Sequence, residues 1–248
     1  AAVNSPKLNL TGLHYHIGSQ IFDMEPFRHT TALMMEFIAQ IKEETGQEIY
    51  ELDVGGGFGI FYTQGDRPGN PEDWAEAVMT TVQEKARYYG LTVPLVIIEP
   101  GRAISGPAGI TLYTIGSFKE VTGIRKYIAV DGGMTDNIRT ALYGAQYSAL
   151  LANKADQQPV ETVSIAGKCC ESGDMLIWDI RLPQVESGDI LAVFATGAYN
   201  YTMSSNYNRL PRPAMVLVNQ GCADLILKRE TYADLLRNDL LPDRLKNR

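Results

Sequence analysis

The sequence contains few cysteines and few histidines. Two of its three cysteines, Cys169 and Cys170, are adjacent, so the three cannot form a framework of spaced disulfides. All three histidines lie between positions 14 and 29, far along the chain from the cysteines, and neither Cys-x-x-Cys nor His-Glu-x-x-His occurs. We therefore expect a reducing compartment and no metal site.

The chain also lacks an excess of positive charge and a long hydrophobic run. It has 22 basic and 29 acidic residues, a net charge of −7, which gives no general attraction to nucleic acid or to anionic membranes. No apolar run approaches the ~20 residues of a membrane-spanning helix, and the first residues do not resemble a signal peptide. With 248 residues, 45% of them hydrophobic, the sequence predicts one large or two modest domains of a cytoplasmic protein.

The first part of the sequence alternates predicted strands with predicted helices. Short apolar runs predict strands at residues 8–16, 49–54 and 95–98. Hydrophobic residues at helical spacing, with Pro near the start and Gly at the end, predict helices at residues 23–46 and 71–89. This alternation is typical of βα units in a parallel sheet or barrel.

The second part contains short β-rich segments separated by turns. Strands are predicted at residues 110–115, 127–130, 160–165, 175–178, 190–194, 215–218 and 225–227. A last helix is expected at residues 231–236, and the charged tail at residues 239–248 is expected to be frayed. The fold class is therefore α/β in the first part and all-β in the second.

A polar or glycine-rich motif follows each predicted strand of the first part. Residues 14–20 read His-Tyr-His-Ile-Gly-Ser-Gln, residues 53–59 read Asp-Val-Gly-Gly-Gly-Phe-Gly, and residues 99–102 read Glu-Pro-Gly-Arg. Because the carboxyl ends of the strands line the active site in βα folds, we expect the three motifs to meet at one opening.

Each motif alone has an ordinary structural interpretation. The glycine run could form a tight turn, His16 could be a hydrogen-bonded core residue, and Glu99 could pair with an arginine. Together they offer glycine amides for a phosphate, a flat ring for stacking, and a carboxylate for a pyridine nitrogen. These are the needs of pyridoxal 5'-phosphate, which we predict as the cofactor.

Three motifs of the second part make the prediction specific. Residues 130–143 read Val-Asp-Gly-Gly-Met-Thr-Asp-Asn-Ile-Arg-Thr-Ala-Leu-Tyr, residues 167–174 read Gly-Lys-Cys-Cys-Glu-Ser-Gly-Asp, and residues 196–199 read Thr-Gly-Ala-Tyr. In this order after the first three motifs, they closely resemble the diaminopimelate decarboxylase family, which uses pyridoxal phosphate and has an alanine-racemase-like fold. The resemblance runs from about Leu10 to Tyr207.

The resemblance implies a domain layout. Residues 1–108 would be the C-terminal part of a pyridoxal-phosphate-binding (β/α)8 barrel of the TIM type. Residues 109–248 would form a C-terminal β domain, a β-sandwich or Greek-key barrel.

The resemblance also assigns cofactor contacts. The residues concerned are His16, Ser19, Gly55, Gly56, Gly57, Glu99, Gly101, Arg102 and Tyr199. His16 would stack on the ring, Ser19 and the amides near Gly57 and Gly101 would bind the phosphate, and Glu99 would pair with the ring nitrogen. Such a pair lets charge left by departing carbon dioxide spread into the ring.

The substrate contacts implied by the resemblance come mainly from the second part. Arg102, Arg139 and Tyr143 would hold the distal carboxylate, since an arginine fork binds a carboxylate with two hydrogen bonds. Glu171 would receive the distal ammonium, Tyr199 would touch substrate and cofactor, and Cys170 would return the proton. The family places Cys170 and Glu171 in the pocket of a second copy, which implies a homodimer. Cys169 is then structural.

One feature of the family is missing from the sequence. Family enzymes hold the cofactor through a lysine in a Tyr-Ala-x-Lys-Ala-like setting, and no lysine of this chain has that setting. The lysines are Lys7, Lys42, Lys85, Lys119, Lys126, Lys154, Lys168, Lys228 and Lys246. Since the chain starts with Ala1 and a strand is predicted almost at once, we expect the C-terminal portion of a longer enzyme.

The resulting functional prediction is decarboxylation of meso-2,6-diaminopimelate to L-lysine, the last step of lysine biosynthesis. One alternative is a related decarboxylase acting on ornithine, arginine or carboxynorspermidine. The pairing of Arg139 with Tyr143 argues against it, because those substrates lack a second carboxylate. Another alternative is a homologue that binds a ligand or partner without catalysis.

Overall fold

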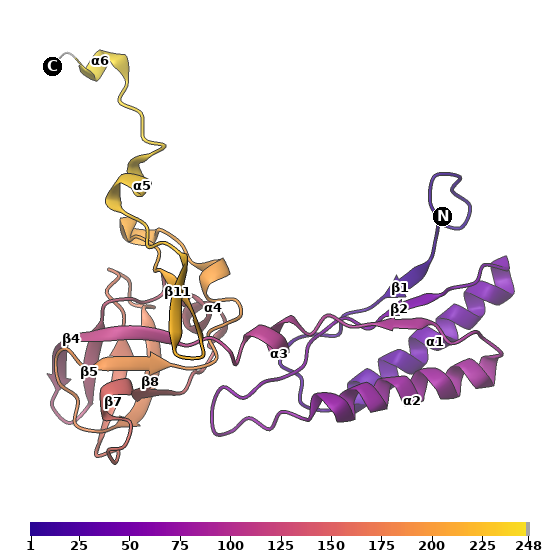
Figure 1. Ribbon diagram of the computed structural model, residues 1–248, viewed down its shortest axis with the longest axis horizontal. Helices are drawn as coiled ribbons and strands as arrows, with labels where there is room; N and C mark the ends of the chain where they lie inside the picture. The colour runs from indigo at the N-terminus through magenta and orange to yellow at the C-terminus, as the bar shows by residue number, and fades with distance from the viewer. Residues whose placement is uncertain (247–248) are drawn as a thin grey trace. The chain divides into compact units, whose positions relative to one another are not determined.

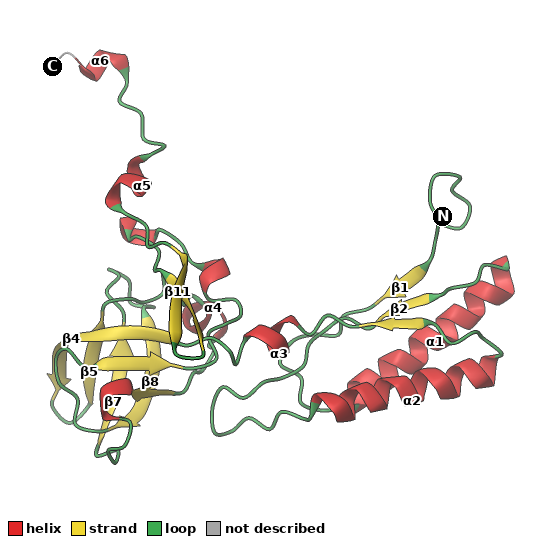
Figure 2. Ribbon diagram, viewed as in Figure 1, coloured by secondary structure: helices red, strands yellow, loops and turns green. Residues whose placement is uncertain are grey.

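The computed structural model describes residues 1–246 and divides into two compact units. The first unit, Ala1–Gly109, alternates strands and helices, and the second, which begins at Ile110, consists mainly of strands (Figures 1 and 2). An α/β part followed by a β-rich part is the order that the sequence predicts.

The first unit is a three-stranded parallel sheet with two long helices on one face (Figure 1). Its elements are β1 (Gly12–His14), α1 (Glu25–Thr45), β2 (Glu51–Asp53), α2 (Pro71–Tyr89), β3 (Leu95–Ile97) and α3 (Gly101–Ser105). The strands lie in the order β1-β2-β3, and Leu13, Leu52 and Val96 are in register across them. The three strands predicted for this part are confirmed, although each is shorter than expected.

The core of the first unit follows from the alternation of side chains along a strand. Leu13, Leu52 and Val96 share one face and pack with the apolar sides of α1 and α2. Leu95, one residue before Val96, lies on the opposite face and is 64% exposed. Burial of one face against the helices is therefore the main stabilisation of this unit.

The two long helices end where the sequence predicts. Gly46 and Gly90 follow α1 and α2 with φ of 71° and 63°, a left-handed conformation that stops a helix and that glycine adopts without steric cost. The side chain of Asn70 accepts a hydrogen bond from the Glu72 amide at the start of α2. Both helix predictions are confirmed.

The second unit contains one sheet of six strands and a separate two-stranded hairpin. Its strands are β4 (Thr111–Val121), β5 (Arg125–Val130), β6 (Ala149–Leu151), β7 (Glu161–Ala166), β8 (Met175–Leu182), β9 (Ile190–Val193), β10 (Met215–Asn219) and β11 (Cys222–Leu227). The six-stranded order is β6-β9-β4-β5-β7-β8, in which only β5 and β7 pair in parallel. All seven predicted strands are present, and β6 was not expected.

Short helices complete the second unit. They are α4 (Arg139–Tyr143), η1 (Ala152–Lys154), η2 (Tyr201–Met203), η3 (Tyr207–Arg209), α5 (Tyr232–Leu236) and α6 (Asp243–Lys246). The helix predicted at residues 231–236 is confirmed, and Thr231 caps it through a capping box with Asp234. The charged tail contains α6, in which Lys246 and Asp243 form an exposed ion pair of 2.6 Å, and its fraying stays a prediction. Residues 247–248 of that prediction lie outside the described part.

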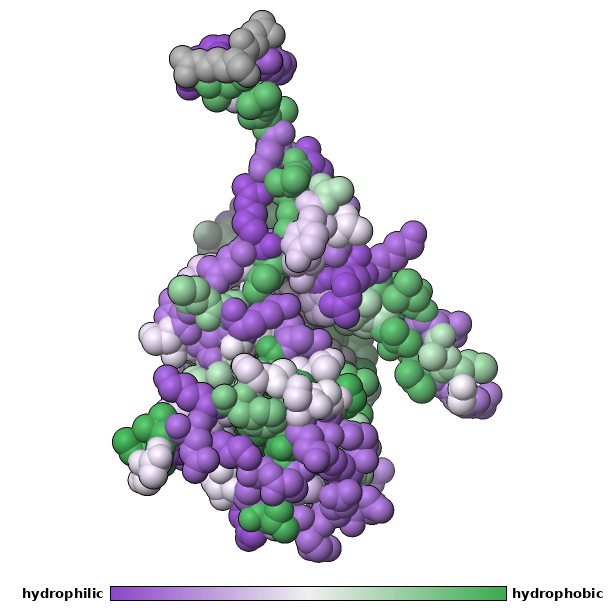
Figure 3. Space-filling model, turned by 90° about the vertical axis from the view of Figure 1, so that its left-hand side faces the viewer, coloured by the Kyte–Doolittle hydropathy of each residue, from purple (hydrophilic) through white to green (hydrophobic). Residues whose placement is uncertain are grey.

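The surface of the second unit is largely polar on the face seen in Figure 3. Its C-terminal segment is an exception, because Leu236, Leu240 and Leu241 are 57%, 90% and 59% exposed. Within residues 1–246, no helix is both long enough and apolar enough to cross a membrane.

Replacement of Leu52 by alanine tests the core of the first unit. Because Leu52 is fully buried, Leu52→Ala should lower the free energy of unfolding of this unit by about 2–5 kcal/mol. Leu95→Ala, on the neighbouring strand but exposed, should change it by less than about 0.5 kcal/mol. Denaturant titrations of both variants measure these changes. Equal losses of stability would contradict the assignment of Leu52 to the core and of Leu95 to the surface.

Candidate active site

Three loops of the first unit meet where β1, β2 and β3 end. A side chain on Gly56 would place its Cβ 2.2 Å from the carbonyl oxygen of Glu99, and one on Gly57 would place it 2.5 Å from that of Gly18. Gly57 also has a φ of 103°, which other residues rarely adopt. The glycine run therefore lets the backbones of the three loops touch.

His16 is fixed by this glycine run. The Gly56 amide donates a hydrogen bond to Nδ1 of His16 at 3.2 Å, so in the neutral ring the proton lies on Nε2. The residue remains exposed. A ring held at one edge and open to solvent can stack on a flat ligand.

Ser19, Tyr62 and Arg102 form a second contact between loops. The Arg102 guanidinium donates to Oγ of Ser19 at 2.8 Å and to the hydroxyl of Tyr62 at 2.6 Å. The amide of Gly101 donates to the Glu99 carbonyl at 2.9 Å, which turns the chain into α3. These bonds bring the predicted residues Ser19, Gly101 and Arg102 to the same strand-end region as His16.

Glu99 lies beside a pair of residues that the sequence analysis did not select. His14 Nδ1 and Asp53 Oδ2 are 3.1 Å apart, and ligand atoms of His14, Asp53 and Glu99 lie within 4.8 Å of one another. Only the positions of these residues could have indicated the pair in the sequence. His14 and Asp53 are in register at the last positions of adjacent strands. The three groups could also bind a cation, although exposed acidic clusters are common without one.

The remaining predicted residues belong to the second unit, where Cys170 and Glu171 share one loop. The Cys170 amide donates to Oδ1 of Asn208 at 2.9 Å, and the residue is exposed. Cys169 is less exposed, and burial together with Asp174 raises the pKa of its thiol to about 11. Of the adjacent cysteines, Cys170 is the more accessible.

The carboxylate of Glu171 is held by hydrogen bonds from its own turn. The Gly173 amide and the Ser172 hydroxyl donate to Oε1 at 3.2 and 3.3 Å. These donors, the Gly173 amide first, lower the pKa of Glu171. Because its pKa is lowered, this exposed carboxylate stays negatively charged and can bind an ammonium group.

Arg139 and Tyr143, both on α4, have different environments. Arg139 is 8% exposed and donates to the hydroxyl of Tyr147 at 2.5 Å. Its guanidinium lies 6.0 Å from the ring centre of Tyr199, so the structure brings these two predicted residues together. Tyr143 is 65% exposed. Tyr147 was not selected from the sequence, since nothing in its local pattern marks it.

Comparisons with known proteins agree with the family resemblance that these motifs indicate. Residues 1–106 match the family described as pyridoxal-dependent decarboxylase, pyridoxal binding domain. Diaminopimelate decarboxylase of Bacillus subtilis is 52% identical over 238 residues, which are 96% of this chain and 54% of that protein. The Synechocystis enzyme of the same name is 49% identical over 97% of this chain and 51% of that protein.

Solved structures of enzymes with the same name are also similar to this chain. Diaminopimelate decarboxylase of M. jannaschii in complex with L-lysine superposes with a TM-score of 0.92 at 39% identity and covers 98% of this chain and 55% of that one. The Helicobacter pylori enzyme with L-lysine gives a TM-score of 0.83 at 29% identity over 95% of this chain and 56% of that one.

With the strand-end glycine loops, the family match places residues 1–106 among the pyridoxal-dependent decarboxylases. Within that class, 94–97% of the chain is similar to enzymes named diaminopimelate decarboxylase, at 49–52% identity. The chain spans about half the length of the curated relatives it matches, 51–54% for those from Synechocystis and Bacillus subtilis.

The first unit fits the cofactor of this class, pyridoxal phosphate. Gly56 and Gly57 let the loops pack backbone to backbone, and at the same strand ends the Ser19 hydroxyl and the Arg102 guanidinium lie 2.8 Å apart and are of the kind that binds a phosphate. Beside them, the exposed residues His16 and Glu99 offer a ring and a carboxylate for the two other parts of the cofactor.

Alkylation of the cysteines tests the difference between the two thiols. Because the thiolate is the nucleophile, the raised pKa of Cys169, about 11, should keep it nearly unreactive with iodoacetamide at pH 8, whereas the exposed Cys170 reacts. Cys169 should become reactive only as the pH approaches 11. Peptide mass spectrometry over a pH series gives the rates, and equal labelling at pH 8 would contradict the assignment.

Proposed function

We propose that the chain is part of an enzyme that decarboxylates meso-2,6-diaminopimelate to L-lysine, the last step of lysine biosynthesis. The enzymes of that name in Bacillus subtilis and Synechocystis are 52% and 49% identical to it. The M. jannaschii and Helicobacter pylori enzymes bind L-lysine in their structures, which is the product of this reaction.

The observation that carries the proposal is the junction of three strand-end loops through Gly55, Gly56 and Gly57. His16 would stack on the pyridoxal ring, Ser19 and the backbone near Gly57 and Gly101 would bind the phosphate, and Tyr199 would contact the cofactor from the second unit. When bound, pyridoxal phosphate supplies an electron sink for the bond that breaks. Glu99 would hold a proton on the ring nitrogen.

Residues of the second unit would select the substrate and complete its conversion. Arg139 and Tyr143, with Arg102 of the first unit, would bind the distal carboxylate, and Glu171 the distal ammonium. The reacting carboxylate leaves as carbon dioxide, and the Cα that remains takes a proton from Sγ of Cys170. The accessible position of Cys170 and the lowered pKa of Glu171 support these roles.

The architecture of the complete enzyme forms part of the proposal. Residues 1–108 would contribute to a (β/α)8 barrel, and residues 109–248 would form a β-sandwich or Greek-key barrel domain. The part of the relatives outside the matched half would supply the lysine that holds the cofactor. The enzyme would be a cytoplasmic homodimer whose copies share active sites.

Carbon dioxide release from different amino acids tests the substrate. The full-length enzyme containing this sequence should act on meso-2,6-diaminopimelate and hardly on ornithine or arginine, because these lack the second carboxylate that the arginines would bind. Initial rates with each substrate, with added pyridoxal phosphate, provide the measurement. A preference for ornithine or arginine would overturn the proposal, and so would a full-length protein that binds no cofactor.

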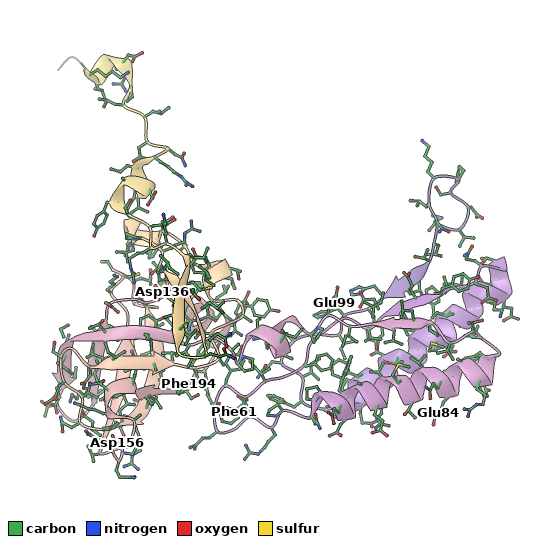
Figure 4. All side chains as sticks on the ribbon, viewed as in Figure 1. Phe61, Glu84, Glu99, Asp136, Asp156 and Phe194 are labelled. Atoms are coloured by element: carbon green, nitrogen blue, oxygen red, sulfur yellow. The ribbon has the colours of Figure 1, made fainter. Side chains whose placement is uncertain are left out.

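Replacement of Glu99 by glutamine tests its pairing with the ring nitrogen. Glutamine has nearly the same shape but does not hold a proton there, so Glu99→Gln should lower kcat on the order of 100-fold with the fold retained. Glu84→Gln is the matched control, because Glu84 is exposed on α2, away from the strand ends (Figure 4). Unchanged turnover in Glu99→Gln would contradict the role.

A further inference from the structure

Asp174 has a carboxylate that joins two loops of the second unit. The residue is only 3% exposed and lies at the end of the loop that precedes β8. Its Oδ1 accepts a hydrogen bond from the Met134 amide at 2.6 Å, and its Oδ2 accepts one from the Cys169 amide at 2.7 Å. Each oxygen therefore binds the backbone of a different loop.

Two glycines make room for this carboxylate. A Cβ on Gly133 would lie 2.6 Å from Oδ1 of Asp174, and a Cβ on Gly167 would lie 2.2 Å from Oδ2. Gly133 has a φ of 153° and is in the first loop, and Gly167 begins the second. Both loops are thus built to approach the same side chain closely.

The two loops lead to the residues assigned to the substrate. The first loop, residues 131–138, ends where Arg139 begins α4. The second loop, residues 167–174, carries Cys170 and Glu171 directly after the amide that Asp174 binds. A change at Asp174 would therefore displace both groups at once.

We propose that Asp174 is a positioning residue that holds the loop of Cys170 and Glu171 against the loop that begins α4. The inference rests on the proposed function for the roles of Cys170, Glu171 and Arg139. Asp174 acts through hydrogen bonds to the backbone and takes no part in the reaction itself. Charge-assisted bonds from the Met134 and Cys169 amides offset the cost of burying its carboxylate.

A second, partly buried carboxylate nearby does not join the loops. Asp136, labelled in Figure 4, accepts from the Gly133 amide at 3.2 Å and from the Thr135 hydroxyl at 2.9 Å, both in its own loop. Burial raises the pKa of Asp136. Of these two carboxylates, only Asp174 links the loops in this way.

The substitution Asp174→Asn in the full-length enzyme tests the proposal. Asparagine has nearly the same size as aspartate but only one side-chain oxygen. Its NH2 group would therefore face the amide N–H of either Met134 or Cys169, and the hydrogen bond to that loop would be lost. We expect kcat/KM to fall on the order of 10–100-fold, while cofactor affinity, measured by absorbance titration, is unchanged. Asp179→Asn is the control, because Asp179 is exposed on β8, pairs with Arg125 and has a φ of 51° that asparagine tolerates.

Two further measurements separate positioning from simple loss of stability. In a Cys170→Ala background, the effect of Asp174→Asn on kcat/KM should shrink without vanishing, because the part that acts through Cys170 is lost while Glu171 and α4 are still displaced. Amide hydrogen exchange should become faster at residues 132–137 and 167–173 of Asp174→Asn, with β4 and β9 unchanged.

The outcomes distinguish this proposal from the proposed function. Wild-type enzyme that does not release carbon dioxide from diaminopimelate overturns the function, and hydrogen exchange then still decides whether Asp174 joins the loops. Active wild-type enzyme with an equally active Asp174→Asn variant overturns the positioning role alone. Additive effects of Asp174→Asn and Cys170→Ala, or exchange that rises throughout the unit, would also overturn it.

Discussion

The first unit depends on close approach of backbone to backbone at the ends of its strands. At Gly56 and Gly57 the neighbouring carbonyl oxygens occupy the space that any Cβ would need. This contact fixes His16 through the Gly56 amide and brings the loop of Glu99 against the glycine run. The arrangement of cofactor groups in this unit is therefore set by the absence of side chains, and the helices and sheet supply a rigid support beneath it.

The second unit organises its loops in a different way, through side chains that bind backbone. Asp174 binds two loops, Asn208 binds the Cys170 amide, and Arg139 is buried against Tyr147. The bonds of Asp174 to Met134 and of Asn208 to Cys170 join residues 40 and 38 positions apart, whereas the other two span five and eight positions. Groups assigned to substrate recognition thus stand on loops whose shape is defined by internal polar contacts.

Much of the fold could be predicted because it depends on local patterns. The helices α1 and α2 combine apolar spacing, a proline near the start and a terminal glycine, so their ends were predicted well. The strand-end motifs that contain His16, Gly56 and Glu99 were predictable as a cluster, since parallel strands bring their carboxyl ends to one edge. The elements α4 and β6 are too short to show a period and were not predicted.

Contacts between distant residues could not be predicted from those patterns. The burial of Arg139 beside Tyr147 and the pairing of His14 with Asp53 depend on how strands and loops pack. Asp174 appears in the sequence as the last residue of a recognised motif, but nothing local indicates that Met134 binds it. Such bonds arise from tertiary structure, which a single sequence reveals only through resemblance.

The three-stranded sheet has a further consequence for handling the protein. Within residues 1–246, its outer strands, β1 and β3, each pair on one side only and leave backbone donors and acceptors on the other. Parallel strands are rarely left uncovered in this way, and Leu95 and Ile97 add apolar surface beside the free edge. Purified alone, the polypeptide should self-associate through these edges, and co-production with a polypeptide that supplies pairing strands should keep it dispersed.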